Sequence, residues 1–163
     1  MKFNYTDLDT CHTASGLVIA IDVLRAFSNA AYAFSRGAKE IRLVSTVDEA
    51  LALRSRLPNA RAMGEVGGLP PAGFDFGNSP AQMLEAELRG ASLIQRTGAG
   101  TQGAVRCVKA EIRLAASYAE AHLDPVRPEF PLSDLDLCTR IDAFNFAMLI
   151  QKEQESLIMR AIK

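Results

Sequence analysis

Asp22 is the first residue whose type and position could do chemistry, because it follows the apolar, β-branched run 17–21. Such a run predicts a strand that is buried on both faces of a parallel sheet. A carboxylate that ends a buried strand is costly to desolvate unless it is paired, hydrogen-bonded or bound to a metal. Asp22 either pairs with Arg25 or caps the helix from Ala26, or it binds a ligand at the strand's carboxyl end, where open α/β sheets place their sites.

Glu65 has a comparable place later in the chain. It ends the short segment 60–65, just before a loop with four glycines and two prolines at 66–78. The carboxyl ends of parallel strands lie at one edge of a sheet, so Asp22 and Glu65 are predicted to converge there. Two such carboxylates suit Mg²⁺, which takes oxygen ligands, keeps several waters and often bridges to phosphate. The alternative for Glu65 is a solvated loop charge.

The string GFDFGNSP at 73–80 places three polar residues ahead of a predicted helix. Ser79 is a good N-cap and a proline follows it at the first helical position. Exposed amides and the helix dipole favour an anion at such a start, which makes Asn78 and Ser79 candidates for substrate binding. Asp75 could add a third metal ligand or simply form an Asx-turn.

A glycine-rich turn, TGAGTQG at 97–103, follows a predicted strand and precedes a helix-forming segment. Residues 98–103 match the spacing G-x-G-x-x-G of a dinucleotide-binding turn. The confirming features are missing, because the first strand carries no such turn and no convincing later strand ends in an acid. The same glycines would cradle a single phosphate through amides that point into the turn.

The elements that must position these residues alternate between strand and helix. Their order predicts a largely parallel sheet with right-handed crossovers and helices against its faces. Asp134 and Asp136 fall in the first turn of the last predicted helix, where acids are favourable. The predicted strands are 17–21, 40–45, 60–65 and 91–96, the predicted helices are 26–36, 46–57, one from 79, 104–122 and 133–144, and a closing hairpin is predicted at 146–150 and 157–162.

Composition indicates one soluble globular domain, with 163 residues of which 48% are hydrophobic and 23% charged. Eighteen basic residues against nineteen acidic ones leave a net charge of −1, which argues against a duplex nucleic acid or an anionic membrane as partner. Three cysteines without paired spacing are typical of reduced thiols. No run is apolar enough for a leader or a membrane span, and we expect a cytoplasmic protein.

Several strings together resemble the 2-phosphosulfolactate phosphatase family, the ComB-like proteins. The resemblance implies a three-layer α/β/α fold and Mg²⁺-dependent hydrolysis of 2-phospho-3-sulfolactate to 3-sulfolactate and phosphate, a step associated with coenzyme M biosynthesis. The order and spacing of the strings are more specific than any one of them. They are IDVLRAFS (21–28), RGAKEI (36–41), GE (64–65), GFDFGNSP (73–80), TGAGTQGAV (97–105) and DLDLCTRIDAFNFAM (134–148).

Under this resemblance the catalytic residues are Asp22, Arg25 and Glu65. Asp22 and Glu65 hold Mg²⁺ or activate water, with Asp75 as a third candidate ligand, and Arg25 offers its guanidinium to the transferring phosphoryl group. The glycine turn donates amides to the phosphate. The candidate substrate-binding residues are Asn78, Ser79, Thr97, Gly98, Gly100 and Thr101.

The chain also departs from the family pattern. Val66 stands where members commonly carry an arginine, and Pro70 and Pro71 stand where a basic residue is common. A phosphate beside a sulfonate favours positive charge, so these changes leave the ester open. We expect a single domain over 1–163 that is shortened between about 104 and 131. A chain joined there across missing residues predicts a Cα separation wider than the roughly 3.8 Å of a trans peptide.

The same residues leave two other classes of protein open. One is a non-hydrolytic protein on this fold that binds an anion or a nucleotide, which predicts stabilisation by the ligand without turnover. The other is a nicotinamide oxidoreductase, which would rest on 98–103 alone. The partner that the leading hypothesis expects is a small-molecule phosphate ester, and the oligomeric state, a homo-oligomer included, stays open.

Overall fold

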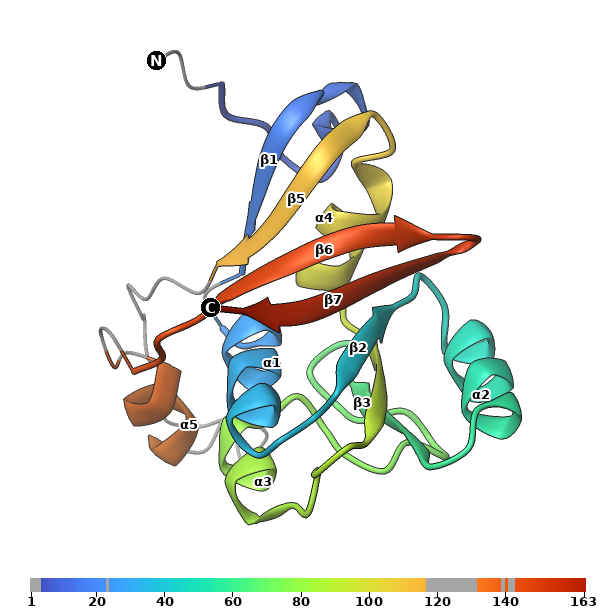
Figure 1. The fold of residues 1–163 in the computed structure, drawn as a ribbon, viewed down its shortest axis with the longest axis vertical. Coiled ribbons are helices and arrows are strands. Elements are labelled where there is room, and N and C mark those ends of the chain that lie inside the picture. Colours follow the sequence, from blue (N-terminus) through green and yellow to red (C-terminus); the bar gives the residue numbers. More distant parts are fainter. Residues whose placement is uncertain (1–3, 23, 117–131, 139, 141–142) are drawn as a thin grey trace.

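The computed structural model describes residues 4–22, 24–116, 132–138, 140 and 143–163. Seven strands form one sheet in the order β1-β5-β6-β7-β2-β4-β3 (Figure 1). The strands are β1 (Gly16–Ile21), β2 (Glu40–Leu43), β3 (Ala60–Gly64), β4 (Ser92–Arg96), β5 (Ala110–Ala116), β6 (Ala147–Glu153) and β7 (Ser156–Ile162). The helices are α1 (Ala26–Ser35), α2 (Val47–Arg56), α3 (Pro80–Glu85), α4 (Gly100–Arg106) and α5 (Leu132–Cys138), with a 3₁₀ turn, η1, at Cys11–Thr13.

The sheet combines two parallel groups with an antiparallel hairpin. Strand β1 pairs parallel with β5, and β4 pairs parallel with both β2 and β3. The hairpin β6–β7 lies between the two groups and pairs antiparallel with β5 on one side and β2 on the other. The predicted α/β class with a C-terminal β-hairpin is therefore confirmed, and the end of the chain closes the middle of the sheet.

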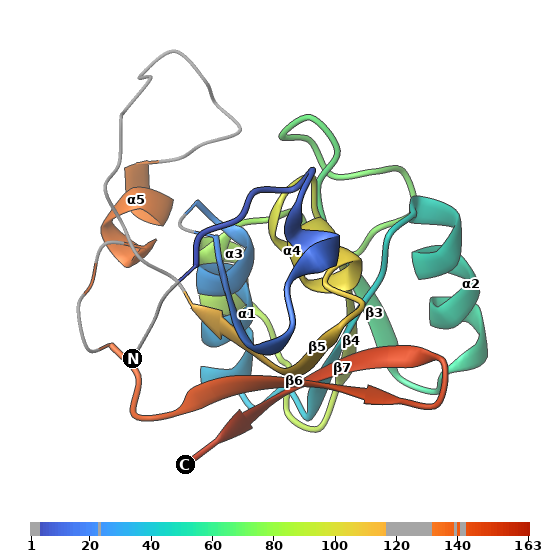
Figure 2. The ribbon, with the colours of Figure 1, turned by 90° about the horizontal axis from the view of Figure 1, so that it is seen from above.

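Helices cover both faces of the sheet around β4. Side chains alternate across a strand, so the neighbours Leu93 and Ile94 point to opposite faces. Ile94 packs in a small cluster with Val44 and Ala50, whereas Leu93 belongs to the main core with residues of α1 and α3. Figures 1 and 2 show β2, β4 and β3 between α2 on one side and α1 and α3 on the other. None of the described helices is long and apolar enough to cross a bilayer.

The capping residues in the sequence predict the starts of two helices correctly. Thr46 accepts a hydrogen bond from the Glu49 amide at 3.1 Å at the start of α2. The Ser79 hydroxyl accepts from the Gln82 amide at 3.4 Å at the start of α3. Both bonds satisfy amides that have no partner within the helix, which is why the cap residues define these boundaries.

The sequence predicts that the first strand is buried on both faces, and this prediction is wrong. Its side chains alternate, and Leu17, Ile19 and Ile21 are 58%, 49% and 62% exposed. Helix α4 packs against β1, and Ile112 of the neighbouring β5 is exposed as well. The apolar run predicted a strand correctly, but a continuous run does not show how many faces are covered.

The helix predicted for 104–122 is wrong from 107 to 116, and 117–122 lie outside the described residues. Helix α4 ends at Arg106, and Ala110–Ala116 forms β5 instead. The string AEIRLAA contains good helix formers, but hydrogen bonding to β1 and β6 overrides that local preference. The last helix also ends earlier than predicted, at Cys138. The proline connector, and the part of the predicted shortening that falls on 117–131, lie outside the described residues.

Candidate active site

Two carboxylates from different strands lie against one turn, 97–101. Glu65, directly after β3, accepts hydrogen bonds from the Gly98 amide and, at 2.8 Å, from the Gly68 amide. Asp22, directly after β1, accepts from the Gly100 amide and, at 3.1 Å, from the Ala26 amide. We call Asp22, Glu65 and the turn 97–101 the glycine-turn site. The bond to Ala26 means that Asp22 also caps α1, which is one of the local roles considered for it.

The turn needs glycine because the carboxylates approach its backbone closely. A Cβ at Gly100 would lie 2.7 Å from Oδ2 of Asp22 and 2.7 Å from the Cβ of Ala26. A Cβ at Gly98 would lie 3.1 Å from Oε1 of Glu65. The spacing G-x-G therefore provides room for two carboxylates. The carboxylate of Asp22 beside Gly100 also disfavours a pyrophosphate at this turn. In addition, β5 ends in an alanine and not in an acid. Both observations weigh against the dinucleotide interpretation.

Asp22 is perturbed by its surroundings. The residue is 9% exposed, and burial raises the pKa of its carboxyl, an effect that the negative charge of Glu65 increases. Hydrogen bonds from the Ala26 and Gly100 amides and the charge of Arg25 oppose this rise without cancelling it. Asp22 therefore holds a proton more readily than an exposed aspartate does.

The two threonines of the turn are held inside the protein. Thr97 and Thr101 are 1% and 0% exposed. The Thr97 amide donates to the Thr101 hydroxyl at 2.7 Å, and the Thr101 amide donates to the Thr97 hydroxyl at 3.0 Å. These reciprocal bonds close the turn and fix its shape. The amides of Gly98 and Gly100 donate to the carboxylates of Glu65 and Asp22, so these two amides do not form an open cradle for a phosphate.

Asp75, the third candidate metal ligand, makes other contacts. Its two oxygens accept from Nε and Nη2 of Arg54, both at 2.7 Å, and Oδ2 also accepts from the Ala62 amide at 2.8 Å. Among the described residues, no three His, Cys, Asp or Glu side chains come together in a group that could hold a metal. The structure thus brings Asp22 and Glu65 to one turn but does not add Asp75 to them.

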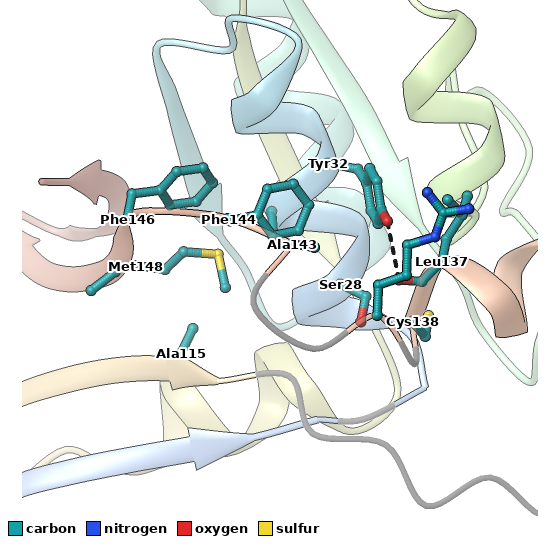
Figure 3. Close-up of a pocket in the computed structure, with 12 residues that line it drawn as sticks. Ser28, Tyr32, Ala115, Leu137, Cys138, Ala143, Phe144, Phe146 and Met148 are labelled. Carbon is teal, nitrogen blue, oxygen red and sulfur yellow. Dashed lines mark hydrogen bonds between the residues drawn. The ribbon is translucent and has the colours of Figure 1, made fainter.

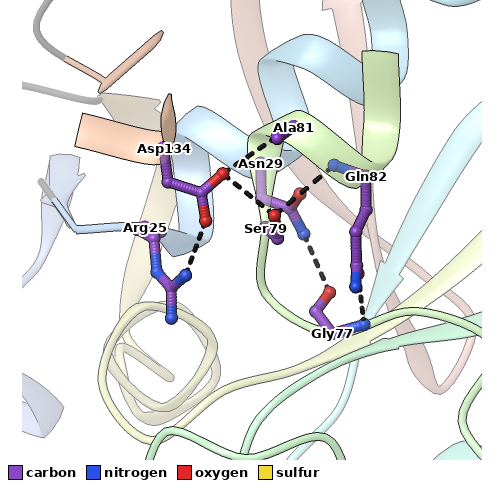
Figure 4. A network of polar contacts seen from close by, with 7 residues as sticks. All are labelled: Arg25, Asn29, Gly77, Ser79, Ala81, Gln82 and Asp134. Atoms are coloured by element: carbon purple, nitrogen blue, oxygen red, sulfur yellow. Dashed lines mark hydrogen bonds and ion pairs between the residues drawn. The ribbon is translucent and has the colours of Figure 1, made fainter. Parts of the chain in front are cut away.

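Arg25 belongs to a buried network that the sequence did not predict (Figure 4). Its Nη1 donates to Oδ2 of Asp134 at 2.6 Å. The other oxygen of Asp134 accepts from the Ser79 hydroxyl and from the Ala81 amide, both at 2.9 Å. The start of α3, predicted as an anion site, is therefore occupied by the protein's own carboxylate. The available signal was that Asp134 opens one of the strings that resemble the family.

Two more polar residues bear on the site, the predicted Asn78 and the unpredicted Arg96. Asn78 is 8% exposed, and its Oδ1 has no hydrogen-bond partner among the described residues. Arg96, at the end of β4, donates to the carbonyl oxygen of Glu65 at 2.9 Å and to that of Ser45 at 3.3 Å. Arg96 supplies a positive charge beside Glu65 that sequence reasoning missed, because it looked for that charge next to Glu65 in the chain.

A cavity of about 260 Å³ lies between α1, α5 and β6 (Figure 3). Its walls are mainly apolar and aromatic and include Tyr32, Phe144 and Met148. Neither Asp22 nor Glu65 lines it, and none of its lining residues is a carboxylate. Acid–base or metal chemistry is therefore assigned to the glycine-turn site rather than to this cavity.

The glycine-turn site has the donor chemistry that Mg²⁺ requires. Mg²⁺ is commonly held by one or two carboxylates together with water and substrate phosphate. Asp22 and Glu65 supply two, and a bound dication would compensate the cost of burying the charge of Asp22, since burial, and after it the charge of Glu65, raises the pKa of that carboxyl. Fold and site thus define an α/β protein with a pair of acidic side chains at a glycine turn after the sheet's parallel strands.

Comparison with known proteins places the chain in a family. Residues 4–123 match the model of the 2-phosphosulpholactate phosphatase family, and the chain belongs to that family. A probable 2-phosphosulfolactate phosphatase of Bacillus subtilis (strain 168) is 43% identical over 103 residues, which are 63% of this chain and 45% of that protein. Proteins of the same name from Deinococcus radiodurans and Thermosynechococcus vestitus are 36% and 39% identical over 65% and 61% of this chain and 45% and 41% of their own length. The chain thus spans about half the length of these relatives.

Proposed function

We propose that this chain is a Mg²⁺-dependent phosphatase that hydrolyses a small acidic phosphate ester, with 2-phospho-3-sulfolactate as the first ester to test. The observation that carries the proposal is the approach of Asp22 and Glu65 to one glycine turn. Membership of the family and the names of the relatives support the same reaction. The products would be 3-sulfolactate and inorganic phosphate.

In the proposed site Asp22 and Glu65 hold the Mg²⁺ ion, which when bound supplies positive charge to the phosphoryl oxygens. Arg25, whose positive charge lowers the pKa of Asp22, binds the phosphoryl group and supplies a second positive charge to it. The glycines at 98 and 100 allow the two carboxylates to stand close to the backbone that orients them. Buried hydrogen bonds between Thr97 and Thr101 keep that backbone rigid.

Asp22 also suits the role of a general base for the attacking water. Burial raises the pKa of its carboxyl, and a base is most effective when its pKa lies near the working pH. The proton from the water would pass to the carboxylate of Asp22. Glu65 keeps its carboxylate in place through the Gly68 and Gly98 amides.

The test is phosphate release from 2-phospho-3-sulfolactate by the full chain, with Mg²⁺ and with EDTA. We expect EDTA to abolish turnover, and Asp22→Asn and Glu65→Gln each to lower kcat by about 10²-fold or more. Asp136→Asn, an exposed acid in an ion pair with Arg140, is the matched control and should behave as the unmodified chain. Undiminished turnover in EDTA or in Asp22→Asn would contradict the proposal. Thermal stabilisation by phosphate without turnover would favour the anion-binding alternative.

A further inference from the structure

Asp134 is an acid in the core whose charge must be compensated. It is 1% exposed, and an ionised carboxylate is very costly to bury without partners. Three donors meet it: Nη1 of Arg25 on one oxygen, and the Ser79 hydroxyl and the Ala81 amide on the other (Figure 4). Asp134 therefore has a defined orientation, with one oxygen directed to Arg25 and the other to α3.

The network joins three segments that are far apart in the chain. Asp134 lies in α5, Arg25 immediately precedes α1, and Ser79 precedes α3. Arg25 and Asp134 are separated by 109 positions in sequence, and their side chains are 4% and 2% exposed. Asp134 also lies beyond the residues 4–123 that match the family model. The segment after that match thus completes the surroundings of Arg25.

Arg25 links this network to the glycine-turn site. Oδ1 of Asp22 accepts a hydrogen bond from the Ala26 amide at 3.1 Å, and Arg25 directly precedes Ala26 at the start of α1. This bond fixes the backbone of Arg25 close to Asp22. An arginine has many rotamers, and an ion pair with a fixed carboxylate selects one of them.

We propose that Asp134 is a positioning residue that holds the guanidinium of Arg25 beside Asp22, where the phosphoryl group binds. This inference rests on the proposed function, because it assigns Arg25 to phosphate. Asp134 itself touches no substrate, and it acts through Arg25. Its tether to Ser79 and Ala81 keeps α5 in register with α3, so that the carboxylate cannot follow Arg25 if the arginine moves.

The test compares Asp134→Asn, Arg25→Gln and the double variant with Asp136→Asn, a control on the same helix. Asparagine at 134 can still accept from Ser79 and Ala81, but it loses the charge that holds Arg25. We expect Asp134→Asn to lower kcat for 2-phospho-3-sulfolactate by about 10- to 100-fold. The double variant should be no slower than Arg25→Gln alone, since Asp134 acts only through Arg25. Multiplicative losses, or an unchanged kcat in Asp134→Asn, would overturn the inference.

A second measurement separates this inference from the proposed reaction. The Kd for inorganic phosphate is determined by calorimetry for the same variants. If the unmodified chain binds phosphate without turnover, the phosphatase proposal falls. The positioning role then survives only if Asp134→Asn weakens phosphate binding at least about tenfold and Asp136→Asn does not. A chain that neither binds phosphate nor turns over the ester overturns both. A lower Tm in Asp134→Asn with unchanged kcat and Kd would reduce Asp134 to a purely structural role.

Discussion

Two aspartate–arginine ion pairs in this protein have similar N–O distances, but one pair is buried and the other is exposed. Arg25 and Asp134 are 2.6 Å apart with side chains that are 4% and 2% exposed. Arg54 and Asp75 are 2.7 Å apart with side chains that are 40% and 24% exposed. Both aspartates fall in strings that resemble family motifs, and only Asp75 was expected at the site. The buried pair adjoins the carboxylates, while the exposed pair holds a loop to α2.

The comparison shows that burial, not bond length, decides what such a pair does. Removing one partner of a buried pair leaves an uncompensated charge in the interior, which is strongly destabilising. An exposed pair exchanges its partner for water at little cost and is screened by salt. The buried pair can therefore enforce one arrangement of Arg25, whereas the exposed pair can only favour one.

The largest effect is expected for Asp134→Ala, which breaks the buried pair. Its free energy of unfolding should fall by about 3–5 kcal/mol, because Arg25 stays buried without its carboxylate. Urea titration followed by circular dichroism at 25 °C measures this. A loss below about 1 kcal/mol, the range of exposed ion pairs, would mean that Arg25 finds another partner and that the two pairs do not differ as described.

Gly100→Ala extends the comparison from charge to shape. The new methyl group would lie 2.7 Å from Asp22 and Ala26, and overpacking of this kind costs about 1–3 kcal/mol. Turnover should be lost as well, since Asp22 must move. The matched control is Gly103→Ala in the same helix, where the nearest atom, on Leu8, is 3.6 Å away. Alanine favours helix, so this control should be as stable as the unmodified chain or more stable.

Asp22 differs from both paired aspartates, because burial raises its pKa above the ordinary 3.8. The native state then binds a proton more tightly than the unfolded state. The free energy of unfolding should therefore fall as pH rises from about 3.8 through the native pKa. Asp22→Asn has no carboxyl at this position, so this fall in the free energy of unfolding is absent. Measured in EDTA, the variant should therefore become more stable relative to the unmodified chain as pH rises. Parallel stability curves for the two proteins would contradict the raised pKa.

The smallest effect is expected for Asp75→Ala. The loss of stability should be a small fraction of that for Asp134→Ala, because Arg54 remains solvated. The loss should shrink further between 0.1 M and 1 M NaCl, because the Debye length falls from about 10 Å to about 3 Å and the exposed ion pair is screened. Urea titrations at the two salt concentrations test this. A large, salt-independent loss would show that the bond from the Ala62 amide to Asp75, rather than the ion pair, stabilises the loop.

Part of the candidate site could be predicted because it depends on strand ends. Asp22 and Glu65 each follow a short strand, and the sequence predicted that they would meet. The structure brings both to the turn 97–101, which the sequence also singled out. Asp134 and Arg96 were missed because their contacts with Arg25 and Glu65 join residues 109 and 31 positions apart. No local pattern encodes such distances.

What the sequence by itself determined is the local structure. Caps at Thr46 and Ser79 and the runs that become β1, β4 and the hairpin all act over a few residues. Tertiary structure alone decided that 110–116 becomes a strand, that one face of β1 is exposed, and which aspartate pairs with Arg25. The reason is that strand pairing and the desolvation of a charge depend on what the rest of the fold packs against them.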